Sequence, residues 1–82
     1  MTITDQLDQV ILGKENSIDL PRFPINKAIQ HMRDLGYKVN QDINGYCVDF
    51  WIYFTKEGAP SFTLSGDLWY ADTYTFYSNE GV

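Results

Sequence analysis

Apolar and polar residues alternate through the middle of the chain, over residues 37–55. The odd positions of 37–43 and the even positions of 46–54 are mostly apolar, a period of two that is typical of β-strands with one buried face. Asn44-Gly45 lies between the two runs and favours a two-residue type I′ turn, because both central residues of that turn need positive φ. The pattern predicts a β-hairpin.

A two-residue turn fixes which residues of the hairpin lie opposite one another. The predicted pairs are Ile43 with Tyr46, Gln41 with Val48, Val39 with Phe50, and Tyr37 with Ile52. A slip of one residue would divide the apolar positions between the two faces, so their agreement supports the hairpin. The opposite, more polar face would carry Lys38, Asn40, Asp42, Cys47, Asp49, Trp51, Tyr53 and Thr55.

Two stretches before the hairpin follow the 3.6-residue period of an amphipathic helix. The first helix is predicted over about 5–12, with Thr2 or Thr4 as its N-cap, and the second over about 24–35. A glycine follows the end of each stretch, as is common at helix C-termini. The segment between them, 14–23, has no sustained period and is predicted to be a loop.

Further strands are predicted after the hairpin, over 61–65 and 73–78. Gly66 leaves two alternatives: it is a strand position or bulge, or it begins a loop over 67–72. The sequence therefore predicts one α+β domain over 1–82. Two short N-terminal helices precede a three- to four-stranded antiparallel β-meander, and helix packs on one face of the sheet.

Negative charge is concentrated in the second half of the chain. The net charge is −5, and residues 1–40 carry five acids and five bases, whereas residues 41–82 carry six acids and only Lys56. The second half also holds eleven of the thirteen aromatic residues. Such a surface repels phosphate backbones and attracts basic molecules, so we expect a basic protein partner and no direct binding of nucleic acid.

Residues able to carry catalysis are few. His31 and Cys47 are the single histidine and cysteine, and they are predicted on opposite sides of the sheet, which argues against a nucleophile and base pair. Segment 40–45 resembles the start of a calcium-binding loop, but Trp51 stands where that loop needs a glutamate. We assign no catalytic, cofactor-binding or metal-ligating residue and expect a protein that is not an enzyme.

The chain shows neither an apolar signal-peptide core near residue 1 nor an apolar run of about twenty residues. We therefore expect no signal peptide and no membrane contact. One cysteine excludes an internal disulfide bond, which fits a reducing compartment. A cytoplasmic location is the expectation.

The more polar face of the hairpin is the candidate functional site. It combines carboxylates with large aromatic side chains, and exposed tryptophan and tyrosine are enriched in protein interfaces. Tyr77, Tyr74 or Trp69 is expected to extend this face from the later strands. Alternatively, the first helix or a symmetric copy of the sheet covers it, so a homodimer is left open. The predicted partner-binding residues are Asp42, Asp49, Trp51, Tyr53, Trp69, Asp67 and Asp72.

These expectations favour a non-enzymatic acidic protein that occupies a basic surface of another protein. Nucleic-acid-binding proteins present such surfaces, so an inhibitor of the phage anti-defence type, such as an anti-CRISPR or anti-restriction protein, is the concrete form. The first alternative is a small regulatory or immunity-type protein that binds an enzyme that does not act on nucleic acid. A carbohydrate-binding module that stacks sugars on Trp51, Tyr53 and Trp69 is the second.

Overall fold

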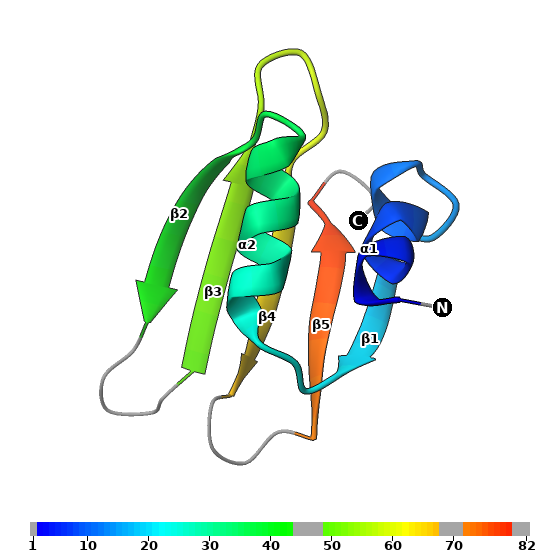
Figure 1. Cartoon of the computed structure of the whole chain (residues 1–82). Coiled ribbons are helices and arrows are strands. Elements are labelled where there is room, and N and C mark those ends of the chain that lie inside the picture. The colour runs from blue at the N-terminus through cyan, green and yellow to red at the C-terminus, as the bar shows by residue number, and fades with distance from the viewer. Residues whose placement is uncertain (1, 44–48, 68–71, 80–82) are drawn as a thin grey trace.

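The chain forms two helices and five strands (Figure 1). The computed structural model describes residues 2–43, 49–67 and 72–79. The elements in chain order are α1 (Ile3–Ile11), β1 (Ser17–Pro21), α2 (Ile25–Asp34), β2 (Lys38–Ile43), β3 (Asp49–Thr55), β4 (Phe62–Asp67) and β5 (Thr73–Ser78).

The strands form one antiparallel sheet in the order β1-β5-β4-β3-β2. Both helices lie on the same face of this sheet, α1 over β1 and β5, and α2 over the middle strands (Figure 1). Strands β2 to β5 follow one another as a meander, while α2 carries the chain from β1 at one edge to β2 at the other. The predicted α+β class is confirmed, but the sheet has five strands instead of three or four.

The fifth strand corrects the prediction of a loop over 14–23. This segment contains β1, which pairs with β5 through Ile18 opposite Phe76 and Leu20 opposite Tyr74. The strand is five residues long and presents only two apolar side chains to the core, which is too short a run to show a period. Its pairing energy comes from a strand more than fifty residues away in sequence.

The core fills the space between the helices and the sheet. Four phenylalanines from three strands are at most 1% exposed, and they pack with Leu7, Val10, Ala28 and Met32 from the helices. Burying a phenylalanine side chain is worth about 3–5 kcal/mol against alanine, so these rings dominate the stability of a domain this small. The four are Phe50, Phe54, Phe62 and Phe76.

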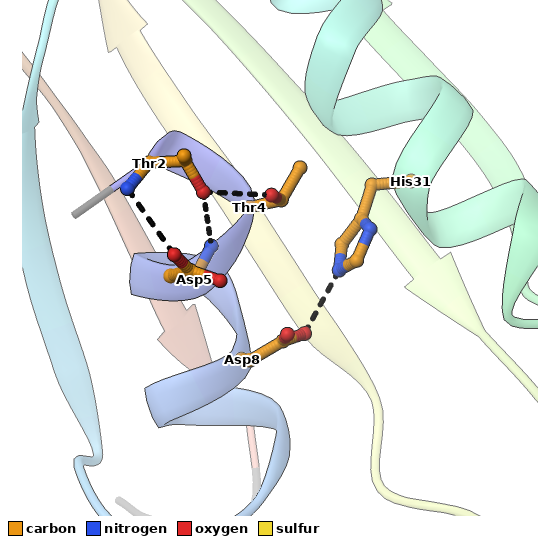
Figure 2. A network of polar contacts seen from close by, with 5 residues as sticks. All are labelled: Thr2, Thr4, Asp5, Asp8 and His31. Carbon is orange, nitrogen blue, oxygen red and sulfur yellow. Dashed lines mark hydrogen bonds and ion pairs between the residues drawn. The ribbon is translucent and has the colours of Figure 1, made fainter.

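The N-terminus of α1 is closed by a capping box (Figure 2). The Thr2 hydroxyl oxygen accepts a hydrogen bond from the Asp5 backbone N–H at 3.2 Å, and the Asp5 carboxylate accepts one from the Thr2 backbone N–H at 3.3 Å. Each bond satisfies a backbone donor that the helix itself leaves unpaired. Of the two predicted caps, Thr2 is therefore the one the structure uses.

The pairing of β2 with β3 differs from the predicted hairpin. Val39 lies opposite Phe54 and not Phe50, and Ile52 lies opposite Gln41 and not Tyr37. Ile43 lies opposite Phe50, whereas a two-residue turn at Asn44-Gly45 would place it opposite Tyr46. The predicted turn at Asn44-Gly45 and the predicted partners Tyr46 and Val48 lie outside the described residues.

Packing explains why this pairing is preferred over the predicted one. A two-residue turn at Asn44-Gly45 would place Phe54 opposite Leu35. Leu35 is the C-cap of α2, so it cannot also extend β2. The observed pairing gives the fully buried Phe54 a strand neighbour in Val39. The difference amounts to four residues, an even number, so each residue stays on its predicted face.

Gly66 is a regular strand position opposite Phe50, which confirms the first of the two alternatives for this residue. A Cβ at residue 66 would lie 2.5 Å from Cδ1 of Tyr74. The glycine therefore allows the Tyr74 ring to approach the backbone of β4. The last strand matches its predicted bounds, 73–78.

Candidate functional site on the outer sheet face

The candidate site is the sheet face that the helices leave uncovered, which we call the outer face. Its positions alternate with the buried core residues along each strand. Helix α1 contributes Leu7 and Val10 to the core on the opposite face and so does not cover it. The described outer-face residues are Ser17, Asp19, Pro21, Lys38, Asn40, Asp49, Trp51, Tyr53, Thr55, Thr63, Ser65, Asp67, Thr73, Thr75 and Tyr77.

Two tyrosines flank a buried threonine in the middle of this face. Tyr53 on β3 and Tyr77 on β5 lie directly opposite Thr63 on β4, one on each side. Thr63 has no exposed surface, and its hydroxyl donates a hydrogen bond to the side-chain oxygen of Asn79 at 2.7 Å. Directly opposite residues have Cβ atoms about 5 Å apart, so Thr63 lies between the two tyrosines in one cross-strand row.

Trp51 stands in the neighbouring cross-strand row. It lies opposite Ser65 on β4, and the same row continues through Thr75 to Asp19 on the edge strand β1. The next two positions of this row, Ser65 and Thr75, carry small side chains. Trp51 is half-buried and Tyr53 is 37% exposed, so neither is part of the enclosed core.

Carboxylates share the outer face with these aromatic residues. Asp49 and Asp67 lie directly opposite each other on β3 and β4, two positions from Trp51 and Ser65 respectively. Like charges directly opposite each other in a sheet destabilise it. Asp19 is exposed at the far end of the tryptophan row, where its carboxylate accepts a hydrogen bond from the Thr75 hydroxyl at 3.0 Å. Among the described outer-face residues, only Lys38 is basic.

The structure brings four of the predicted partner-binding residues together on β3 and β4. Asp49, Trp51 and Tyr53 lie on the outer face as predicted, and Asp67, for which the sequence left strand and loop open, shares that face. Asp42 occupies the β2 position opposite Trp51. The other two do not join this group in the described structure: Trp69 lies outside the described residues, and Asp72 is exposed in the bend before β5.

The later strands correct one expectation and add one residue. Tyr74 belongs to the inner face, where it is 3% exposed and packs edge-to-face on Phe50 at 5.1 Å between ring centroids. Tyr77 is the tyrosine of β5 that reaches the outer face. Asp19 was missed because its segment was predicted to be a loop, and only the alternation of Ile18 and Leu20 around it indicates its side.

The single histidine lies on the helical side of the molecule (Figure 2). His31 Nε2 on α2 lies 2.8 Å from Asp8 Oδ1 on α1, and this contact joins the two helices. Cys47, which was predicted on the opposite side of the sheet from His31, lies outside the described residues. Within the described part of the chain, no three histidine, cysteine or acidic side chains gather in a way that could hold a metal ion.

Comparison with known proteins found no matching family model, no similar curated protein and no similar solved structure. Neither described helix is long and apolar enough to cross a membrane.

Proposed function

We propose that this protein is a non-enzymatic binding protein whose outer face occupies a basic surface of a partner protein. One observation carries the proposal: Trp51 and Tyr53 stand partly exposed beside Asp49 and Asp67, on the face without helices. Aromatic anchors of this kind supply most of the binding energy in many interfaces, while surrounding charges select the partner.

The charge distribution supports a basic partner. All of the net charge of −5 belongs to residues 41–82. In the described structure these residues form the strands β3, β4 and β5 and half of β2. A negative face of this kind speeds association with a positively charged surface and disfavours a phosphate backbone.

The concrete form of the proposal is an inhibitor that competes with DNA or RNA for a nucleic-acid-binding protein. Small phage anti-defence proteins, including anti-CRISPR and anti-restriction proteins, act in this way. The surface that a nucleic-acid-binding protein offers to phosphates is also the surface that an acidic sheet face would fit.

The alternative with a specific observation in its favour is carbohydrate binding. Trp51, Tyr53 and Tyr77 share one sheet face, and aromatic side chains on such a face can stack against sugar rings. Stacking does not depend on the surrounding carboxylates, so salt and charge reversal distinguish the two functions. A regulatory protein whose target is an enzyme that does not act on nucleic acid would use the same residues, but it would not compete with nucleic acid.

The test begins with affinity capture from the native host, followed by binding measurements with the purified partner. We expect a basic partner whose association slows between low and high salt and is blocked by its own nucleic acid. Asp49→Lys should weaken binding, whereas Glu15→Lys, the same charge change in an exposed turn before β1, should have a smaller effect.

Two results would count against the proposal. Direct binding of DNA or RNA by the isolated protein would contradict the expected repulsion. Partner binding that is indifferent to salt, to Asp49→Lys and to competing nucleic acid would favour the regulatory or carbohydrate-binding alternatives.

A further inference from the structure

Strand β2 forms an edge of the sheet that can accept another strand. It is six residues long, and among the described strands β3 is its single neighbour (Figure 1). Edge strands present unpaired backbone N–H and C=O groups, which proteins commonly block with proline. The opposite edge, β1, ends in Pro21, which has no N–H to donate, whereas β2 contains no proline.

We propose that β2 pairs antiparallel with β2 of a second copy of this chain. The two five-stranded sheets then form one ten-stranded sheet around a two-fold axis perpendicular to it. Such an axis keeps the outer faces of both copies on the same side of the joined sheet. An outer-face residue of one copy can therefore lie opposite only an outer-face residue of the other. The residue numbers of every opposite pair therefore sum to an even number.

Charge complementarity selects one pairing among these. With Asn40 opposite Asn40 on the axis, Lys38 of each copy lies opposite Asp42 of the other, so the two charged positions of β2 form two opposite-charge pairs. With Gln41 on the axis, Asp42 lies opposite Asn40 and no opposite charges meet. Cross-strand pairs of opposite charge stabilise a sheet, so the structure favours the axis at Asn40.

This dimer differs from the face-to-face arrangement that would cover Trp51 and Tyr53. Edge pairing leaves both outer faces open and adjacent, which doubles the surface that the proposed function uses. The dimer does not depend on that function, because its contacts are the backbone and side chains of β2. Pairing of one short strand buries little area, and interfaces below about 1,200 Å² are typical of weak, reversible complexes.

Oxidative cross-linking tests the position of the axis. In a Cys47→Ser background, Asn40→Cys places two thiols directly opposite each other, so a disulfide-linked dimer should form in the purified protein. Lys38→Cys is the matched control on the same strand, because its two copies lie about four residues apart along the pair, roughly 13 Å, too far for a disulfide. Lys14→Cys is the control in the exposed turn after α1.

Sedimentation analysis over a range of protein concentrations tests the charge pairs. The unmodified chain should dimerise reversibly, Lys38→Asp should weaken the dimer about tenfold, and Lys38→Asp with Asp42→Lys should restore it. Lys14→Asp changes the net charge equally and should leave the dimer unchanged. Circular dichroism confirms that each variant is folded.

The proposal is overturned if the unmodified chain stays monomeric up to the highest concentration studied. It is equally overturned if Asn40→Cys cross-links no better than the two controls, or if the charge swap fails to restore a dimer that Lys38→Asp has weakened. If the unmodified chain dimerises but captures no basic partner, that result would count against the proposed function alone.

Discussion

A Cβ on Gly66 of β4 would lie only 2.5 Å from Cδ1 of Tyr74, so the Tyr74 ring occupies space that a side chain at residue 66 would need. Phe50 ring carbons lie 3.2 Å from the same point, and Tyr74 packs edge-to-face on Phe50. The absent side chain at residue 66 thus lets two aromatic rings from β3 and β5 meet over β4.

We predict that Gly66→Ala destabilises the fold by about 1–3 kcal/mol, the usual cost of overpacking a well-filled core. The free energy of unfolding from urea titration measures it. Ser65→Ala, one position earlier and on the outer face, is the control and should change stability by less than about 0.5 kcal/mol. If the Tyr74→Leu variant relieves the contact, adding Gly66→Ala to it should cost less than in the unmodified chain. Equal costs in both backgrounds would contradict the proposed contact.

The capping box of α1 gives a second prediction. Thr2→Ala removes the hydroxyl that accepts from the Asp5 backbone N–H, so it should lower stability by about 1 kcal/mol. Thr4→Ala is the control, because the Thr4 hydroxyl contacts only the Thr2 hydroxyl among the bonds at this helix end, at 3.0 Å. Thermal or urea unfolding of the two variants would settle the point. A larger loss for Thr4→Ala would show that the cap is assigned to the wrong threonine.

Tyr37 gives the prediction on pH. The ring is 8% exposed and packs edge-to-face on Phe62, and burial raises the pKa of its phenol above the ordinary value of 10.0. The folded state therefore holds this proton more tightly than the unfolded chain does. Stability is retained below about pH 10 and falls as pH rises from there through the raised pKa of the folded state.

Unfolding measured between pH 8 and the highest pH at which the protein stays folded checks this. Tyr37→Phe should make the loss of stability above about pH 10 less steep, because one source of the linkage is removed. Tyr53→Phe removes a phenol from the exposed outer face and serves as the control. The same pH slope for Tyr37→Phe and the unmodified chain would refute the assignment.

The sequence predicts faces well and strand pairing poorly in this protein, for one physical reason. Side chains alternate with a period of two. A one-residue error in the pairing register therefore moves apolar residues to the wrong face, whereas a four-residue error leaves every residue on its face and cannot be detected from the apolar pattern. Val39 therefore keeps its face whether it lies opposite Phe50, as predicted, or opposite Phe54, as observed. The register of β2 and β3 thus differs by four residues from the register that a two-residue turn at Asn44-Gly45 would set.

The same reason explains which part of the candidate site was foreseen. Asp49, Trp51 and Tyr53 were placed correctly because their face depends only on alternation along one strand. Asp19 was missed because β1 is only five residues long, and the strand with which it pairs, β5, lies more than fifty residues away in sequence. The side of Tyr74 and Tyr77 could not be fixed in advance, since the connection before β5 was undecided.

The most direct test of the proposed function is Trp51→Ala, with Phe50→Ala as its matched control one position away. Phe50 is 1% exposed on the inner face, and its truncation should cost about 3–5 kcal/mol of stability. Trp51 is half-buried on the outer face, so Trp51→Ala should keep cooperative unfolding with a much smaller loss of stability while partner affinity falls by about 2 kcal/mol or more. Severe destabilisation by Trp51→Ala, with the remaining folded protein binding its partner normally, would make Trp51 a structural residue and contradict the account.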